Sequence, residues 1–387
     1  MYETFIILIA FLLAANPGLI ELGEFGSAPP NVAAATQQSE KLVIPLEGLD
    51  SVLLSGGKEV QGDEQFSVKR GRYRYLFANA ETKAAFEREP GRYEIQLEGT
   101  CARMGPTVQG NPDLFTVHEG RIYVFGSEAC VTIFKAAPAS FLEAVAGTAP
   151  AASYSEEAKK RGRALVEKAV EAMGGAARLD GLVSYQEKGT AGARSPQGVT
   201  EIKTSLSMVY PDKIRIERTL SFGTIANVVT PQGGFFVFPR GGGEMLDVQR
   251  AAFVKQVESR PLAFLRGRRG SGFSAAAAGA SKVGDATVES VEVTSGGMNA
   301  ILGIEPATGR VLSFAYRGRG SSGAFGKIVQ TFSDHRNVGG LTLPFKIAGT
   351  FNGEAEPSLT SNIEAIVVNG EVSPALFEKP KPAAGGQ

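Results

Sequence analysis

The sequence predicts an α+β protein of two domains, a small α+β domain followed by a curved antiparallel sheet that carries helices on its concave face. Its 387 residues are enough for two domains of ordinary size. Glycine is abundant at 48 residues, and Thr, Val, Phe and Ser are frequent, which favours strands and tight turns. A stretch rich in Ala and Pro at 142–154 separates two differently patterned segments, so we expect a flexible linker there.

The chain begins with an apolar segment. Phe5 to Leu13 reads FIILIAFLL, which fits the apolar core of a signal peptide. It is shorter than the apolar stretch that a membrane-spanning helix needs. The residues before it contain Glu3 and no Lys or Arg, so residues 1–20 fit either an atypical signal peptide or an uncleaved anchor. We therefore expect a periplasmic or secreted protein that associates peripherally with the cell envelope. Residues 21–41 are predicted to be a disordered tether.

The first domain is expected at 42–141. Phe66, Val68 and the aromatic residues from Tyr73 to Phe77 alternate with polar residues, which predicts two strands joined by a polar turn at 69–72. Asn79 is a good helix N-cap, and the helix after it should end before Pro90.

These residues belong to a longer pattern. The pattern consists of GLDSV at 48–52, GKEVQGD at 57–63, FANAETKAAFEREPGRY at 77–93, GTCARMG at 99–105, NPDLFTVHEGRIYV at 111–124 and VTIFK at 131–135. It resembles the extended, exported form of the YHS domain family. The resemblance implies a domain that binds heavy metals or small ligands. The cysteine that many short YHS domains carry after their aromatic strand is missing here.

Four residues of this domain could bind a metal. Cys101 stands where the extended YHS family has its cysteine, and Met104, His118 and Cys130 follow; thiolate, thioether and imidazole together suit a soft ion such as copper(I). The alternative, which we favour, is a Cys101–Cys130 disulfide or two plain buried thiols, because these are the chain's two cysteines and export exposes them to oxidation.

The second domain is expected at 155–379, followed by a disordered tail at 380–387. A helix should begin at Ser155 and end at Gly174, and a second helical stretch at 246–265 should be interrupted near Pro261. Between and after them the pattern predicts strands at 183–188, 200–210, 213–220, 224–230, 234–239, 286–294, 300–305, 311–317, 327–338, 343–352 and 357–368. So many short antiparallel strands with few helices favour a curved open sheet or half-barrel.

The layout of this domain resembles the LolA and LolB lipoprotein-carrier family. The segments that carry the resemblance are the helix ending AMGG, VYPDKIRIE at 209–217, GIEPATGRVLSFAY at 303–316, FSDHRNVGGLTLPFKI at 332–347 and NIEAIVVNGEVSPALF at 362–377. It implies an apolar cavity that receives acyl chains, so the expected partner is a hydrophobic small molecule, lipid or lipoprotein. Candidate lining residues are Phe222, Phe235, Phe236, Phe238, Phe253 and Phe264, although each could instead belong to an ordinary core.

Catalytic and nucleic-acid functions are not expected. Asp334, His335 and Arg336 are consecutive at a strand end, so their side chains alternate and cannot converge, and no nucleophile-elbow, phosphate-loop or HExxH motif occurs. Lys plus Arg and Asp plus Glu balance at 40 each, and we interpret the basic run at 266–270 as a solvated loop rather than a nucleic-acid contact. We therefore predict a non-enzymatic binding protein with no cofactor beyond a copper-like ion.

Overall fold

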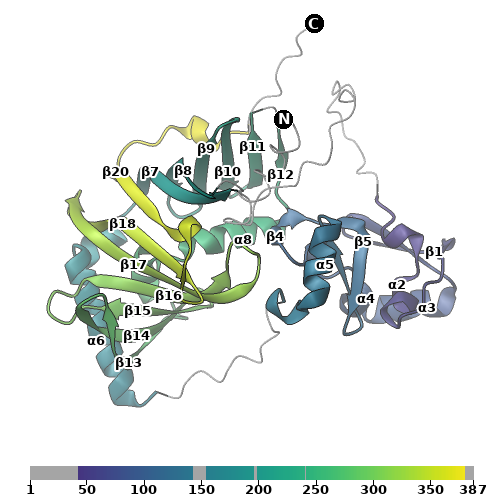
Figure 1. The fold of residues 1–387 in the computed structure, drawn as a ribbon, viewed down its shortest axis with the longest axis horizontal. Coiled ribbons are helices and arrows are strands. Elements are labelled where there is room, and N and C mark those ends of the chain that lie inside the picture. Colours follow the sequence, from purple (N-terminus) through teal and green to yellow (C-terminus); the bar gives the residue numbers. More distant parts are fainter. Residues whose placement is uncertain (1–41, 143–153, 196–197, 240, 380–387) are drawn as a thin grey trace, which may run out of the picture. The chain divides into compact units, whose positions relative to one another are not determined.

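The computed structural model describes residues 42–142, 154–195, 198–239 and 241–379. Contacts between residues divide the chain into unit 1 (Met1–Ala144) and unit 2 (Val145–Gln387), and the division falls inside the expected linker at 142–154. Both units are visible in Figure 1. The signal segment, the tether and the C-terminal tail that we expected lie outside the described residues. Within the described ranges no helix combines the length and apolar character needed to cross a membrane.

Unit 1 has an α+β fold with one two-stranded and one four-stranded sheet. Its helical elements are η1 (Leu46–Gly48), α2 (Ser51–Ser55), α3 (Ala80–Arg88), α4 (Pro90–Tyr93), η2 (Leu97–Gly99), α5 (Glu128–Ala136) and η3 (Pro138–Ser140). Its strands are β1 (Asp63–Arg70), β2 (Tyr73–Phe77), β3 (Thr100–Cys101), β4 (Gly105–Gln109), β5 (Asn111–His118) and β6 (Arg121–Phe125). The predicted hairpin and helix are confirmed, and Asn79 accepts hydrogen bonds from the first turn of α3.

The two halves of unit 1 repeat one local structure. η1 and η2 both read Leu-Glu-Gly, and all three residues of each adopt positive φ angles. The hairpin β1–β2 shifts register between Asp63 and Ser67, and the hairpin β5–β6 shifts in the same place, between Asn111 and Phe115. Each hairpin then leads into a helix capped by a polar side chain, Asn79 for α3 and Ser127 for α5.

This repetition places Cys101 in the position that Asp50 has in the first half. Asp50 is fully buried, and its carboxylate accepts the backbone N–H groups of Val52, Leu53 and Ala78. The Cys101 sulfur accepts from Met104 in the corresponding loop, and the backbone of Gly126 hydrogen bonds to it as well. Both side chains therefore tie the loop after the Leu-Glu-Gly turn to the start of the following helix.

Unit 2 is built around one large antiparallel sheet. Its strands are β7 (Ser184–Ser195), β8 (Gly198–Val209), β9 (Lys213–Leu220), β10 (Gly223–Thr230), β11 (Gly233–Phe238), β12 (Gly241–Glu244), β13 (Ser274–Val283), β14 (Ala286–Ser295), β15 (Met298–Ile304), β16 (Val311–Arg319), β17 (Phe325–Val338), β18 (Leu341–Phe351), β19 (Glu354–Ala355) and β20 (Ser361–Val368). Its helical elements are α6 (Glu156–Met173), α7 (Ala176–Asp180), α8 (Asp247–Glu258), α9 (Pro261–Arg266), η4 (Gly267–Arg269), η5 (Pro357–Leu359) and η6 (Pro374–Phe377).

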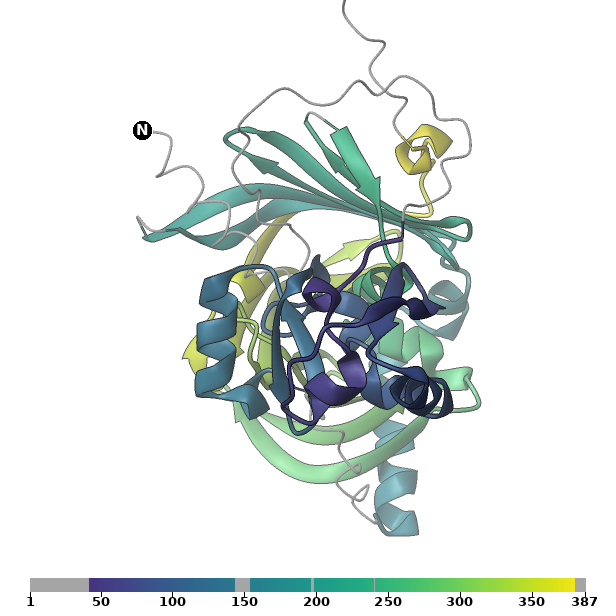
Figure 2. The same ribbon diagram turned by 90° about the vertical axis from the view of Figure 1, so that its right-hand side faces the viewer.

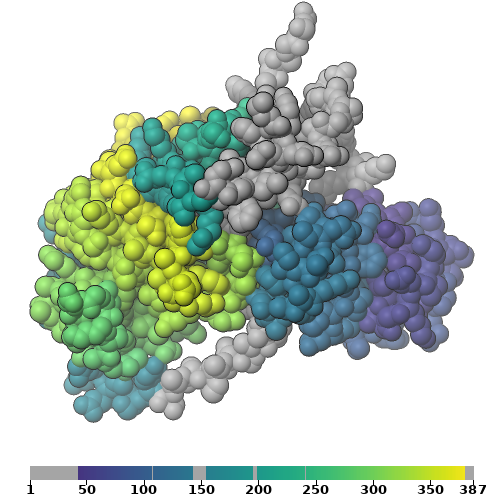
Figure 3. All heavy atoms as spheres, in the orientation of Figure 1, coloured from purple at the N-terminus to yellow at the C-terminus, as the bar shows by residue number. Residues whose placement is uncertain are grey.

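The sheet has two halves that meet at β20. Its order is β12-β11-β10-β9-β8-β7-β20-β18-β17-β16-β15-β14-β13, with β19 paired to β18. β20 pairs with β7 over most of its length, but its register with β18 consists only of Lys346 with Asn362 and Ile347 with Ser361. The joint between the halves is therefore short, and Figure 2 shows how strongly the sheet bends. In the space-filling view the yellow C-terminal residues lie beside the green residues of the second half (Figure 3).

The α-helices cover one face of this sheet, which we call the inner face. The helices α6, α8 and α9 share one core with inward residues of the strands, among them Phe314 of β16. The helices contribute Val166, Val170, Phe253 and Leu265 to this core. Figure 1 shows α8 between the two halves of the sheet. The curved antiparallel sheet with helices on one face is confirmed, as are the helix from Ser155 to Gly174 and the break near Pro261.

The basic run at 266–270 is not a solvated loop. Arg268 is buried and makes a bidentate ion pair with Asp180, at 2.8 and 3.1 Å. Arg266 donates to the carbonyl oxygens of Leu179 and Leu182. The first two arginines of the run thus hold α7 and the chain after it in place, because buried carbonyl and carboxylate oxygens need donors.

The group Asp334–Arg336 lies inside β17 rather than at a strand end. Asp334 has a left-handed backbone with φ 52°, and its carboxylate pairs with the Arg336 guanidinium at 2.6 Å. Burial, followed by the charge of Arg310, lowers the pKa of His335. The Asp334 carboxylate is therefore paired with Arg336, two residues along the same strand.

Candidate functional site

The expected lining residues divide between the two faces of the sheet. Phe236 and Phe238 of β11 lie on the inner face and stack with ring centroids 6.3 Å apart. Phe253 of α8 and Phe264 of α9 are buried in the core between the helices and the sheet. Phe235 faces the opposite side, where it packs with Val228 and Phe377, and Phe222 is exposed in the turn between β9 and β10. Phe222 and Phe235 therefore do not lie on the inner face, and their prediction as residues that line a cavity there is wrong.

The inner face of β9, β10 and β11 changes character along the strands. On β9 the inward residues Ile214 and Ile216 belong to the core under the helices, whereas Arg218 and Leu220, further along the same face, do not. We call the surface beyond the core the distal patch. It consists of Arg218, Leu220, Ile225, Asn227, Phe236 and Phe238. The first five are buried, and Phe238 is half-buried.

Strand pairing makes the distal patch continuous. Arg218 lies directly opposite Ile225, and Asn227 lies opposite Phe236. Residues opposite one another in antiparallel strands point to the same face and lie about 4.5–5.5 Å apart at their Cβ atoms. Two polar side chains are thus placed inside a surface that is otherwise apolar.

Arg218 differs from the other inward arginines. It is 8% exposed, and burial alone lowers the pKa of its guanidinium to about 10. By contrast, Arg260 pairs with Glu187 at 3.0 Å, and Arg268 pairs with Asp180. Among the described residues, Arg218 has no carboxylate, hydroxyl or carbonyl partner. A buried guanidinium normally has such partners, because a charge without them is costly to bury.

Asn227 shows the same deficit. The residue is 5% exposed, and no other described residue hydrogen bonds to its side-chain amide. Buried amides are normally hydrogen-bonded, and each exception calls for an explanation. The sequence offered a signal for Arg218 that we missed: within the alternating strand 213–220, an arginine occupies the apolar series Ile214, Ile216, Leu220.

A charged cluster elsewhere on the inner face is self-contained. Tyr185 donates to Glu187 at 2.7 Å, and Arg260 donates to the same carboxylate. Burial raises the pKa of Tyr185 well above its ordinary value, and the Glu187 charge adds to the effect. Arg266 stacks over the Tyr210 ring at 3.7 Å. The carboxylate of Glu187 is thus engaged by Tyr185 and Arg260.

A groove of about 350 Å³ lies on the other face of the sheet. It crosses β14 to β17, and the residues lining it include Glu292, Asn299, Ile301, Arg317 and Lys327. These positions alternate with inward residues such as Val293 and Phe314, so they point away from the helices. The groove is therefore not the apolar cavity that we expected between the sheet and its helices.

In unit 1 three of the four candidate metal ligands come together. Arg103 contacts the Met104 sulfur at 2.8 Å and the Cys130 sulfur at 3.8 Å, and Cys101 hydrogen bonds to Cys130. His118 instead packs edge-on against the Phe134 ring of α5. Across the described ranges no group of three or more His, Cys, Asp or Glu residues has the geometry of a metal site.

Both cysteines are free, buried thiols in the structure. The hydrogen bond from Cys101, with those from Ser127 and Arg103, lowers the pKa of Cys130 to about 5, while the pKa of Cys101 is raised. Because the two thiols hydrogen bond to one another, they are close enough to be oxidised together. The Cys101–Cys130 disulfide therefore stays a prediction, and so does the copper-like ion.

Comparison with known proteins gives matches among solved structures only. No family model matches the chain, and no curated protein matches it. Two solved structures are similar to 56% of the chain: a DUF1329 family protein from Desulfovibrio piger (10% identity, 96% of that chain, TM-score 0.39) and a LolA superfamily protein from Nitrosomonas europaea (12% identity, 97% of that chain, TM-score 0.39). The similarity concerns the C-terminal part. TM-scores this low carry no argument about function, and the YHS resemblance of residues 42–141 stays a prediction.

Proposed function

We propose that the protein is a non-enzymatic carrier or sensor that binds a hydrophobic ligand, of the lipid or lipidated class, at the distal patch of unit 2. The observation that carries the proposal is the patch itself. Phe236, Phe238, Ile225 and Leu220 form a continuous apolar surface on the inner face, beyond the core that the helices complete. Small-molecule sites are lined mostly by apolar side chains and carry a few polar groups that fix the orientation of the ligand, and the composition of the patch fits that description.

The expected location outside the cytoplasm belongs to the same proposal. An exported carrier meets lipids and lipoproteins at the cell envelope, which agrees with the apolar segment at 5–13. The LolA superfamily likeness agrees with the proposal but, at its TM-score, does not carry it.

The test is binding of the neutral dye N-phenyl-1-naphthylamine, whose fluorescence rises in apolar surroundings, to the full chain. We expect saturable binding that Phe236→Asp weakens by at least about tenfold, since it places a charge in the apolar surface. Phe222→Asp is the matched control, because Phe222 is exposed in a turn and its substitution should leave binding unchanged. Unaltered binding in a folded Phe236→Asp variant, or no binding by the wild type, would contradict the proposal.

A further inference from the structure

Arg218 and Asn227 are the polar groups of the distal patch, and they are more than nine-tenths buried. The other charged residues of β8 and β9 point outward: Glu201 and Lys203 alternate with Ile202 and Thr204, and Arg215 pairs with Glu217 at 2.6 Å. Arg218 is therefore the single charged group that these two strands direct to the inner face. Its charge is not balanced by any described residue.

Chemistry decides what would satisfy these two groups. The guanidinium supplies up to five N–H donors in a planar fork, which matches the oxygens of a carboxylate or phosphate. The Asn227 amide adds two donors and an acceptor. The patch thus offers an excess of positive charge and of donors, and the surface around them is apolar.

We propose that the ligand of the distal patch is an amphiphile with an anionic head group, a carboxylate or a phosphate monoester. Arg218 and Asn227 bind the head-group oxygens, and the apolar chain lies against Phe236, Phe238 and their neighbours. This inference rests on the proposed function and specifies it: the patch selects anionic over neutral amphiphiles of the same chain length. Selection follows because a neutral head group would leave the buried charge of Arg218 uncompensated.

The experiment compares three competitors with one identical chain: palmitate, hexadecyl phosphate and hexadecanol, each displacing N-phenyl-1-naphthylamine from the full protein. For the wild type we expect at least one of the two anions to compete at a concentration at least about tenfold below that of hexadecanol, the effect of one charge-assisted hydrogen bond. We call the ratio of the hexadecanol concentration to the anion concentration needed for equal displacement the gap. The anion with the larger gap identifies the head group. Arg218→Met should reduce the gap to about twofold or less while dye and hexadecanol still bind.

Two controls keep the result specific. Lys203→Met also removes one positive charge, but from an exposed residue on the outward side of β8 beside Thr204, the direct partner of Arg218. It should leave the gap intact. Asn227→Leu, in a chain that keeps Arg218, should also narrow the gap. Arg218→Gln provides a polar, uncharged variant if Arg218→Met does not fold.

The outcomes separate the inference from the function on which it rests. Equal competition by all three compounds in the wild type would overturn the anionic head group and leave apolar binding standing. A gap that survives in folded Arg218→Met or Arg218→Gln would also overturn the inference. Failure of the wild type to bind the dye or any competitor would instead overturn the proposed function.

Discussion

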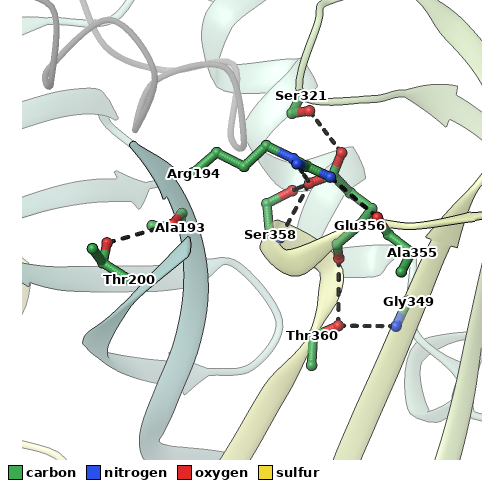
Figure 4. A network of polar contacts seen from close by, with 9 residues as sticks. All are labelled: Ala193, Arg194, Thr200, Ser321, Gly349, Ala355, Glu356, Ser358 and Thr360. Carbon is green, nitrogen blue, oxygen red and sulfur yellow. Dashed lines mark hydrogen bonds and ion pairs between the residues drawn. The ribbon is translucent and has the colours of Figure 1, made fainter. Parts of the chain in front are cut away.

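Glu356 holds the short joint between the two halves of the unit 2 sheet, and its replacement tests how much that joint depends on one carboxylate. The side chain is 7% exposed. It accepts hydrogen bonds from the hydroxyls of Ser321 at 2.6 Å and Ser358 at 2.9 Å, and it pairs with Arg194 at 3.4 Å. Figure 4 shows how these contacts connect β7, the β16–β17 turn and the segment that leads into β20.

Glu356→Ala should destabilise unit 2 by about 2–4 kcal/mol. Hydrogen bonds to a charged group contribute about 1.5–3 kcal/mol each, but the variant also removes a buried charge, and Arg194 is partly exposed, which reduces the loss. For a unit of this size the melting temperature should fall by roughly 5–10 °C. Glu354→Ala is the matched control, because Glu354 is exposed and belongs to the same segment.

The pH dependence provides a second measurement. Burial raises the pKa of Glu356, but the hydrogen bonds from Ser321 and Ser358 and the charge of Arg194 together outweigh it, so the folded-state pKa lies below the ordinary 4.5. The stabilisation is therefore complete above about 4.5, and it is lost as the pH falls through the lower folded-state value. When the free energy of unfolding is measured by urea denaturation at a series of pH values, Glu356→Gln should remove most of this decrease at low pH. Equal stabilities of the wild type and Glu356→Ala at pH 7 would refute the role of the carboxylate.

The remaining predictions concern the arginine run and the thiols. Arg268→Met should cost about 2–4 kcal/mol in urea denaturation, since it leaves Asp180 without its buried partner, whereas Arg269→Met, at a largely exposed residue, should cost under about 1 kcal/mol. Similar small losses for both would show that Arg268 does not anchor α7. In protein exported by its own cell, Cys101 and Cys130 should resist alkylation in denaturant until reductant is added, as measured by mass spectrometry. Labelling of both without reductant would exclude the disulfide.

Strand patterning predicted most of the unit 2 sheet, and its failures have physical causes. The strand expected at 213–220 is β9, and that expected at 327–338 lies within β17. β13 escaped prediction because it reads SAAAAGASKV, in which the single residue that favours strands is Val283 at its end. The small residues are required by packing: a Cβ at Gly162 of α6 would lie 2.5 Å from the Ala276 backbone. The close approach of a helix dictates the composition there, and composition alone does not reveal the neighbour.

The repeat in unit 1 was also present in the sequence, in the two Leu-Glu-Gly turns and the paired segments around Tyr75 and Tyr123. It was hidden because the identical letters are few, whereas the shared features are a backbone conformation and a bulge. Within this repeat, Asp50 and Cys101 have the same position but different chemistry. The first half thus shows that the position requires only an acceptor for backbone N–H groups, so a thiol there is not explained by the fold alone.

Charge is the property that sequence reasoning treated least well, because the free energy of a charge depends on its partners more than on its neighbours in the chain. Arg268 lies in a basic run that indicated solvent, yet it is buried and paired with Asp180. Arg218 lies in an ordinary alternating strand, yet it is buried without a described partner. The first residue stabilises a helix, so its cost is offset within the fold. The cost of the second is offset by nothing described in the fold, and a ligand that binds the folded state and supplies an anion would offset it.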